Sequence, residues 1–318
     1  MISVIIPTFN GKDLLKNNLP NLINELSDFS HEIIVSDDGS TDDTIEFLKD
    51  NHKPYIKIFS SEENKGFSSA CNSGLQIARG DYILLLNNDV SIKEPFLKKL
   101  LINFNEETFC VVPRIRIPGE NNPEEGFTVI DFSDGDLKIL MPNMNGEHYE
   151  FDQPIEIPHG VAACALYSRE KLLDLGGFDT VLNPYFWEDV DLSTRALKKG
   201  WKIIYDSSVS VIHEKSRTVH KYYDHDPRFI TNLKNRLLFT WKQIDSKDLI
   251  RKHYFFLNFL VRKAVLLKDI NTLQAFDSAI KNINNINRIK SEKLSLSEII
   301  EKYGISKYEK YLCNSPVL

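Results

Sequence analysis

Short apolar runs alternate with amphipathic segments through the first third of the chain. The runs are Ser3–Ile6, Glu32–Ser36, Tyr55–Phe59 and Asp81–Leu86, and helical spacing occupies the intervals at Leu14–Leu26, Asp42–Asp50 and Ser68–Arg79. Buried strands separated by amphipathic helices are typical of a mainly parallel sheet with helices on both faces. We therefore expect an α/β fold.

The pattern changes twice further along the chain. Pro, Gly, Asn and acidic residues dominate Pro113–Pro158, where only Phe127–Phe132 and Lys138–Met141 look like strands. A long irregular stretch in a compact domain is usually a functional loop. Strand patterns return at Gly160–Ser168, Trp201–Tyr205 and Ser208–His213, with helices near Arg169–Leu175 and Asp189–Lys199 between them. Helical spacing then predominates, at Phe229–Ile244 and Leu249–Leu267, so we expect a sheet domain at 1–220 and a helical region at 221–318.

Composition narrows the class of protein. The 318 residues are 42% hydrophobic and carry a net charge of −6, which is typical of a soluble globular chain and argues against a nucleic-acid partner. The four cysteines are far apart, which makes a disulfide framework or zinc site improbable and favours a reducing compartment. No basic leader precedes the first strand and no apolar run nears the length of a membrane span, so we expect a cytoplasmic protein.

Polar clusters follow the first, second and fourth predicted strands. They are Pro7-Thr-Phe-Asn-Gly11, Ser36-Asp-Asp-Gly-Ser-Thr-Asp42 and Asn87-Asn-Asp89. Each cluster alone could be a turn or a helix cap. Because ligands bind at the carboxyl ends of strands in open parallel sheets, the three together predict a binding crevice.

The motifs in this crevice resemble those of the family 2 glycosyltransferases with the GT-A fold. The resemblance rests on Ser3-Val-Ile-Ile-Pro-Thr-Phe-Asn10, Ser36–Asp42, Asn64-Lys-Gly-Phe67 with Asn72-Ser-Gly74, Asp81–Asp89, Glu188-Asp189 and His213, in that order. The forms Asn-x-Gly-Phe and Leu-Leu-Asn-Asn-Asp are similar to a subgroup with rhamnosyl- and galactofuranosyltransferases. Dinucleotide and P-loop glycine motifs do not occur.

The resemblance implies a site for a nucleotide-diphosphate sugar, with Asp38 accepting the N–H of a uracil or thymine base. It implies further donor-binding residues at Pro7, Thr8, Asn10, Asn64, Gly66, Asn72, Asn87 and Asn88. Asp89 and His213 match the family's metal ligands, for Mn²⁺ or Mg²⁺. Asn87 departs from the pattern, because the family often has Asp at that position.

The resemblance also makes Asp189 the general base. On the acceptor side it implies His159, Gly160, Trp187 and Glu188. Each has a structural alternative: the acidic residues suit a helix N-terminus, Gly160 suits close strand packing, and Trp187 suits a core. Asp191 and Arg195 stand four residues apart on the predicted helix and could form an ion pair.

Near the C-terminus, the apolar segment His253–Val261 is flanked by Arg251, Lys252, Arg262 and Lys263. It could contact the inner face of an anionic membrane, but packing on the main domain is the commoner explanation and the one we favour.

The resemblance therefore implies an inverting transfer of a hexose or deoxyhexose from a UDP- or dTDP-sugar to a saccharide or lipid-linked saccharide, in surface-polysaccharide assembly. The alternatives are a catalytically silent scaffold that binds nucleotide sugars, favoured by Asn87, and a nucleotidyltransferase, for which the first polar cluster fits poorly.

Overall fold

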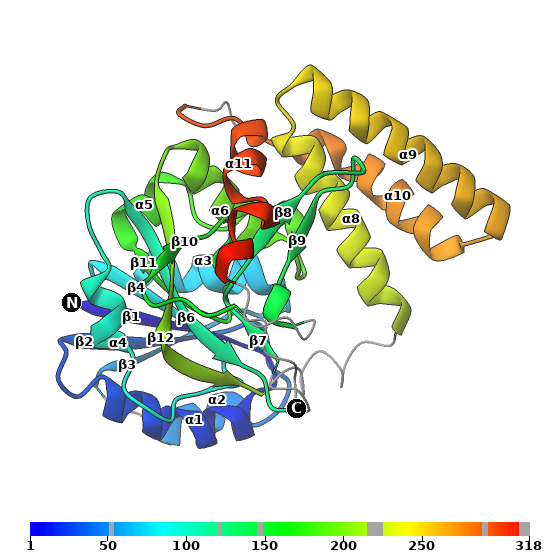
Figure 1. Ribbon diagram of the computed structural model, residues 1–318. Coiled ribbons are helices and arrows are strands. Elements are labelled where there is room, and N and C mark those ends of the chain that lie inside the picture. Colours follow the sequence, from blue (N-terminus) through cyan, green and yellow to red (C-terminus); the bar gives the residue numbers. More distant parts are fainter. Residues whose placement is uncertain (51–53, 120–122, 145–148, 215–224, 288–291, 312–318) are drawn as a thin grey trace.

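A computed structural model describes residues 1–50, 54–119, 123–144, 149–214, 225–287 and 292–311 of the chain. Within these residues, ten strands form one mixed sheet whose main path runs β10-β12-β6-β11-β4-β1-β2-β3 (Figure 1). The strands of this path are β1 (Ile2–Thr8), β2 (His31–Asp37), β3 (Ile56–Ser60), β4 (Tyr82–Leu86), β6 (Thr108–Arg116), β10 (Ile155–Glu156), β11 (Cys164–Ser168) and β12 (Lys202–His213).

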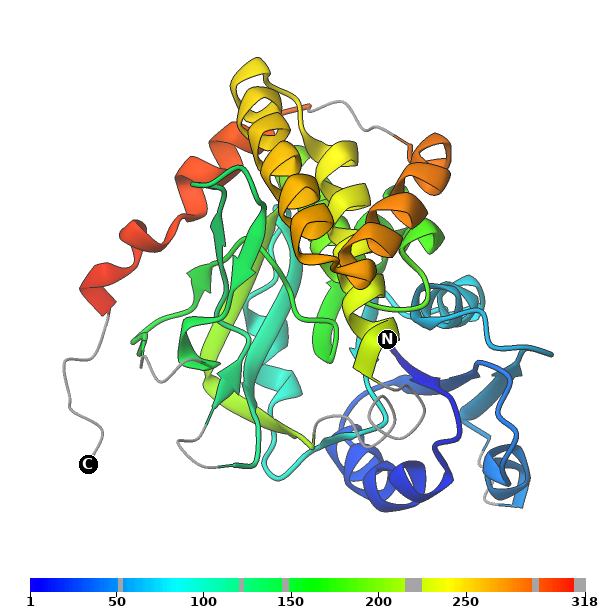
Figure 2. The same ribbon diagram turned by 90° about the vertical axis from the view of Figure 1, so that its right-hand side faces the viewer.

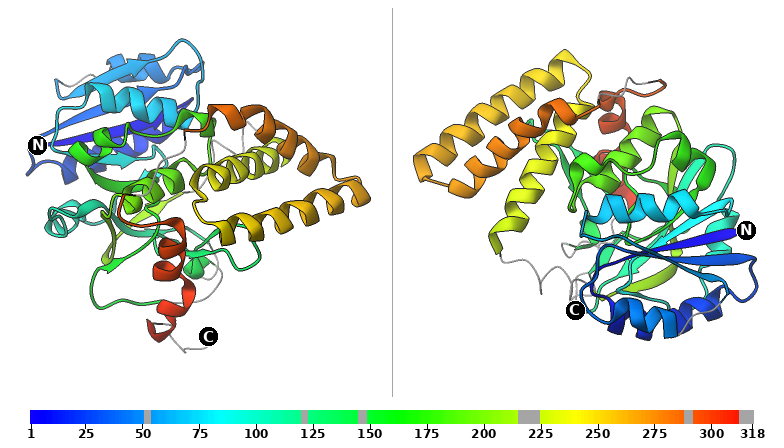
Figure 3. Two further views of the ribbon diagram at one scale, coloured as in Figure 1. Left: turned by 90° about the horizontal axis from the view of Figure 1, so that it is seen from above. Right: turned by 180° about the vertical axis from the view of Figure 1, so that it is seen from behind.

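The first half of the sheet is parallel. Strands β3, β2, β1 and β4 pair in one direction, and the helices between them cover both faces. Helices α1 (Lys12–Glu25) and α2 (Thr44–Asp50) lie on one side, while α3 (Phe67–Ile77) lies on the other (Figures 1 and 3). All seven positions of β1 are buried, as expected for a strand covered on both faces. The expected α/β fold is confirmed.

The second half of the sheet is mixed. Strand β11 is antiparallel to both β4 and β6, and β6 is parallel to β12. The short strands β5 (Val90–Ser91) and β7 (Glu124–Glu125) add to β12 and β6. Helices α4 (Leu97–Ile102), α5 (Arg169–Asp174) and α6 (Glu188–Lys198) connect these strands, and β8 (Val129–Asp131) with β9 (Lys138–Leu140) makes a separate ribbon.

Two boundaries differ from the sequence prediction. The two strands predicted at 201–205 and 208–213 are one strand, β12, because the chain continues through a register irregularity between Asp206 and Ser210. The segment predicted to be irregular from Pro113 begins inside β6. Pro113 pairs with Asp206 where the register shifts, and this is a place where a strand tolerates a residue without an N–H donor.

The C-terminal region is helical, as expected. It contains α8 (His225–Gln243), α9 (Lys247–Leu267), α10 (Ile270–Asn282) and α11 (Leu296–Tyr303). Figures 1 and 2 show α8, α9 and α10 grouped beside the sheet, with α10 packed against both others. Helix α11 returns to the sheet domain and contacts β8 and α6. No helix in the described part of the chain is long and apolar enough to cross a membrane.

Cys71, Cys110 and Cys164 are free and buried. Cys313 lies outside the described residues.

Candidate functional site

Two cavities open where the strands end, and they share a wall. The larger has a volume of about 600 Å³ and the smaller about 170 Å³. Both are lined by Phe67, Asn87, Asp89 and Tyr185, so a ligand could extend from one into the other.

The small cavity collects most of the predicted donor-binding residues. Its lining includes Pro7, Thr8, Asp38, Asn64, Gly66, Asn87 and Asn88. They come from the carboxyl ends of β1, β2 and β4 and from the loop before α3, as the sheet topology requires. The buried hydroxyl oxygen of Thr8 and side-chain oxygen of Asn87 have no hydrogen-bond partner in the described part of the protein, so both remain available to a polar ligand.

Asp38 holds the loop that forms one wall of this cavity. Its carboxylate accepts hydrogen bonds from the backbone N–H of Lys65 at 2.9 Å and of Gly66 at 2.7 Å. Burial raises the pKa of Asp38, in opposition to these hydrogen bonds. A carboxylate has more than two acceptor positions, so this structural role leaves capacity for a ligand N–H.

Gly66 is required where the loop meets the segment before α6. Its φ is +94°, and a Cβ atom there would lie 2.7 Å from Cα of Pro184. The N–H of Phe67 donates to the carbonyl of Pro184 at 2.8 Å. This contact brings the loop against the segment that carries Tyr185, and the two together close the side of the small cavity.

Two predicted donor-binding residues lie outside the cavity linings. Asn10 accepts the backbone N–H of Thr41 at 2.7 Å and so fixes the turn after β2. Asn72 exchanges two hydrogen bonds of 2.8 Å with the backbone of Phe178. Both asparagines therefore hold backbone segments in place and do not line either cavity.

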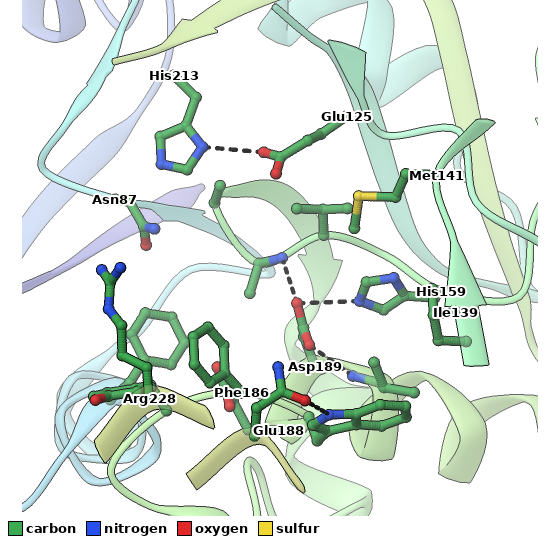
Figure 4. Close-up of a pocket in the computed structure, with 18 of the residues that line it drawn as sticks. Asn87, Glu125, Ile139, Met141, His159, Phe186, Glu188, Asp189, His213 and Arg228 are labelled. Carbon is green, nitrogen blue, oxygen red and sulfur yellow. Dashed lines mark hydrogen bonds and ion pairs between the residues drawn. The ribbon is translucent and has the colours of Figure 1, made fainter. Parts of the chain in front are cut away.

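Asp89 and His213 face each other across the pairing of β5 with β12. Val90 is in register with His213, which places the preceding Asp89 beside the histidine ring. Asp89 Oδ1 lies 3.2 Å from His213 Nε2. The other ring nitrogen lies 3.1 Å from Glu125 Oε2 (Figure 4). Burial lowers the pKa of His213, but the two carboxylates outweigh burial and raise it to about 9.

Once His213 Nε2 has lost its proton, these donor atoms fit a divalent cation. An octahedral ion with bonds of about 2.1 Å holds neighbouring ligand atoms about 3 Å apart, close to the 3.2 Å between Asp89 and His213. The hydrogen bond that the Nδ1–H of His213 donates to Glu125 fixes the orientation of the histidine ring. The described residues contain no cluster of three or more His, Cys, Asp or Glu side chains suited to a metal.

Asp189 lies at the first turn of α6 and lines the large cavity. Its carboxylate accepts the N–H of Val190 at 2.8 Å and of Ala162 at 3.3 Å, and it lies 3.1 Å from Nε2 of His159. Burial would raise the pKa of Asp189, but the neighbouring imidazole and these N–H donors lower it overall. The side chain is 18% exposed, so an ionised carboxylate in a fixed orientation reaches the cavity.

The other predicted acceptor-side residues surround Asp189. Glu188 is buried in the cavity wall, and burial together with the Asp189 charge raises its pKa well above the ordinary value. Trp187 lines the cavity, packs against Phe239 and donates its indole N–H to Asn232. Gly160 lies behind the lining, where a Cβ atom would meet the Cys110 sulfur at 2.8 Å.

A family model described as glycosyl transferase family 2 matches residues 3–176, which is more than half of the chain. The chain belongs to glycosyl transferase family 2. Asp189 and His213 lie beyond the matched range.

Several bacterial relatives are named as glycosyltransferases or as a chondroitin synthase. The chain is 25% identical over 289 residues to an uncharacterized glycosyltransferase of Haemophilus influenzae, covering 87% of both chains. It is 35% identical over 111 residues to the uncharacterized glycosyltransferase YfnE of Bacillus subtilis, and 24% identical over 222 residues to a chondroitin synthase of Pasteurella multocida. These matches cover 34% and 63% of this chain, but only 28% and 23% of those two relatives.

Solved structures agree on the fold. The chain resembles GalNAc-T7, solved with UDP, GalNAc and Mn²⁺, with a TM-score of 0.63 and 20% identity over 77% of this chain and 48% of that one. It also resembles S. aureus TarS, solved with UDP-GlcNAc, with a TM-score of 0.59 and 18% identity over 89% of this chain and 81% of that one. At such identities the similarity establishes the GT-A fold of this family member.

Several residues that line the site had no signal in the sequence. Glu125, Ile139 and Met141 come from the Pro113–Pro158 stretch, which was expected to be functional. Arg228 and Asn232 reach the large cavity from α8. The predicted boundary at residue 220 therefore separates elements that contribute to one cavity.

Another α8 residue fixes the segment before Asp189. Asn235 is fully buried, and its amide nitrogen lies 2.9 Å from the carbonyl oxygens of both Tyr185 and Phe186. Phe186 and Trp187 both have φ of +75°, an unfavourable conformation for residues with side chains. A backbone conformation with positive φ persists where the surrounding structure enforces it, and the hydrogen bonds of Asn235 are one such constraint.

Proposed function

We propose that this chain transfers a sugar from a UDP- or dTDP-sugar to an acceptor hydroxyl with inversion at the anomeric carbon. The nucleotide would occupy the small cavity, where Thr8, Asp38 and Asn64 offer polar contacts. The acceptor would occupy the large cavity, and the sugar would lie near the wall that the two cavities share.

One observation carries this proposal. Asp189 and the Asp89–His213 pair line the same cavity, and Asp89 also lines the small one. Asp189 as the base for the acceptor and the Asp89–His213 pair as the cation site for the diphosphate would thus serve one reacting centre. A direct displacement needs both, because the nucleophile attacks the anomeric carbon from the face opposite the leaving group.

Asp189 would act as the general base. Its lowered pKa keeps the carboxylate ionised near neutral pH. It would take the proton of the acceptor hydroxyl while the hydroxyl oxygen bonds to the anomeric carbon. The bond from that carbon to the diphosphate oxygen breaks, and the nucleoside diphosphate leaves with the electron pair.

Asp89 and His213 would hold Mn²⁺ or Mg²⁺, which would stabilise the charge that grows on the diphosphate. Asn87 lies at this wall and adds no negative charge, so Asp89 would supply the only carboxylate of the Asn87-Asn-Asp89 motif. Burial and the charge of Asp189 raise the pKa of Glu188 well above its ordinary value, and in its protonated form Glu188 would donate a hydrogen bond to a sugar oxygen.

The acceptor would be a saccharide or a lipid-linked saccharide. The large cavity combines aromatic rings at Tyr185, Phe186 and Trp187 with small side chains at Ala162 and Ala163. Flat rings suit the apolar faces of sugars, and small side chains leave room for them. The similarity to a chondroitin synthase supports a role in polysaccharide assembly.

A thermal-shift panel tests the donor class. The protein is heated with UDP, dTDP, GDP and their sugar conjugates, each with and without Mn²⁺. We expect a uridine or thymidine diphosphate to stabilise the protein only with Mn²⁺, by about 2.7 kcal/mol at one hundred times its dissociation constant. Stabilisation by GDP alone would contradict the donor assignment, and stabilisation without any transfer to a panel of sugars would favour a silent scaffold.

A further inference from the structure

The outward side of α9 presents a row of large apolar side chains to solvent. Phe255 is 60% exposed, Phe259 is 66% exposed and Leu266 is 81% exposed. Phe255, Phe259, Arg262 and Leu266 follow one another at spacings of four, three and four residues, so these side chains share one side of the helix. Contiguous exposed apolar surface of this kind usually marks an interaction site.

The opposite side of α9 already has its partners within the chain. Leu249, His253 and Ala264 are buried, and the ring of His253 lies 2.8 Å from the carbonyl oxygen of Gly135 and 3.0 Å from the indole nitrogen of Trp241. The packing expected from the sequence is therefore present, and it uses only this inner side. Figures 2 and 3 show α9 at the outer edge of the α8–α10 group, with its other side facing away from the sheet.

The charge of α9 is opposite to that of the whole chain. Five of its residues are basic and one is acidic, which gives a net charge of +4 in a protein whose net charge is −6; the residues are Lys247, Arg251, Lys252, Arg262, Lys263 and Asp248. Arg251 lies 5.9 Å from the ring centre of Phe255, and Lys263 lies 5.9 Å from that of Phe259. The cations thus flank the aromatic rings on the exposed side.

We propose that this outward side of α9 docks on the surface of an anionic lipid bilayer. Helices that lie in the membrane interface combine Phe and Leu side chains with Lys and Arg. The apolar rings would enter the boundary between headgroups and acyl chains, while the long basic side chains extend to the lipid phosphates. A second copy of the chain is a poor occupant, because two surfaces with the same positive charge would repel each other.

Docking on α9 would also affect the proposed reaction. Helix α10 packs against both α9 and α8, and α8 contributes Arg228 and Asn232 to the large cavity. A docked α9 would hold the acceptor cavity close to the bilayer, which suits a lipid-linked acceptor. This consequence rests on the proposed function, whereas binding of the protein to lipid does not.

Vesicle flotation tests the proposal without any enzymatic reaction. The protein is mixed with vesicles of neutral phosphatidylcholine, or of the same lipid with about 30 mol% phosphatidylglycerol, and its partition coefficient is measured. The charge variant carries Arg251→Glu, Arg262→Glu and Lys263→Glu, and the apolar variant carries Phe255→Ser, Phe259→Ser and Leu266→Ser. The matched control carries Lys98→Glu and Ile102→Ser on α4, where Ile102 is 74% exposed.

We expect wild type and the α4 control to bind anionic vesicles equally well and neutral vesicles weakly. The charge variant should lose about a hundredfold in partition coefficient, since each basic residue contributes roughly fivefold. The apolar variant should lose tenfold or more. Circular dichroism and a thermal melt establish that each variant is folded, which is expected because all the changed side chains are exposed.

Four results would overturn the proposal. Wild type could bind both kinds of vesicle equally or neither, or both α9 variants could bind as wild type does. Alternatively, sedimentation could reveal a wild-type dimer that the α9 variants dissociate, which would make this surface a contact between copies. If lipid binding is found while no nucleotide sugar is bound, the proposed function fails and the docking surface stands.

Discussion

Asp191 is fully buried and joins α6 to the helical region, so its removal should destabilise the whole protein. Its carboxylate accepts hydrogen bonds from Arg195 at 2.7 Å and Gln243 at 2.8 Å, and it lies 2.8 Å from the ammonium group of Lys242. The pair of Asp191 with Arg195 confirms the interaction expected from their spacing. Lys242 and Gln243 belong to α8, so this one carboxylate links the element that carries Asp189 to the C-terminal helices.

Asp191→Asn keeps the shape of the side chain and removes its charge. Arg195 and Lys242 are each 3% exposed, so the substitution leaves two buried cations with less compensation. Removing one partner of a buried ion pair typically lowers the free energy of unfolding by about 3–5 kcal/mol. Arg195 still donates hydrogen bonds to two backbone carbonyls, and Lys242 still pairs with Asp179 at 2.6 Å. We therefore expect the free energy of unfolding to fall by an amount near the lower limit, about 3 kcal/mol.

The measurement is urea denaturation followed by circular dichroism between pH 7 and pH 3. Burial opposes ionisation of Asp191, but the two cations outweigh it and lower its pKa. A carboxylate with a lowered pKa stabilises the folded state fully above its unfolded pKa, about 3.9, and this contribution is lost as pH falls through the folded pKa. The difference between wild type and Asp191→Asn should therefore stay constant down to about pH 5 and shrink below about pH 4.

The matched control is Asp174→Asn, which breaks the exposed pair with Lys199. Asp174 lies 2.6 Å from that lysine, but its side chain is 51% exposed, so the loss should stay within about 0.5 kcal/mol. A loss below about 1 kcal/mol for Asp191→Asn, or one that does not change at low pH, would refute the importance of this network.

Three further substitutions test the walls of the site. Gly66→Ala should weaken nucleotide binding at least tenfold in calorimetry, because the new methyl group would lie 2.7 Å from Pro184 Cα; unchanged affinity would show that the loop shifts freely. Glu125→Gln should lower Mn²⁺ affinity about 10–100-fold, since Glu125 orients His213, and unaltered metal titration would exclude that role. Asn235→Ala should reduce kcat more than nucleotide affinity, because it releases the segment before α6; an equal effect on both would indicate general destabilisation.

The sequence predicted the parallel half of the sheet well, and the physical reason is local. Strand β1 is buried on both faces, so it is a continuous apolar run that ends at a polar cluster. The mixed half was predicted less accurately. Strand β6 contains Pro113 and β12 contains a register irregularity, and neither feature can be recognised without the partner strand.

Some residues of the candidate site were predicted from the sequence and others were not. Asp38, Asp89 and Asp189 stand in short motifs, and the resemblance of those motifs to the family 2 glycosyltransferases singled them out. Glu125 comes from a two-residue strand, and Arg228 comes from a helix far along the chain. Such residues reach the cavity only through tertiary packing, so neither periodicity nor motif spacing could indicate them.

The most direct test of the account is a comparison of Asp189→Asn with wild type in donor binding and in transfer. The variant keeps the size of the side chain and removes only the basic carboxylate. We predict that it binds the nucleotide sugar with Mn²⁺ within about threefold of wild-type affinity, while transfer in a single turnover falls at least a hundredfold. Transfer at the wild-type rate would contradict the assignment of Asp189 as the base.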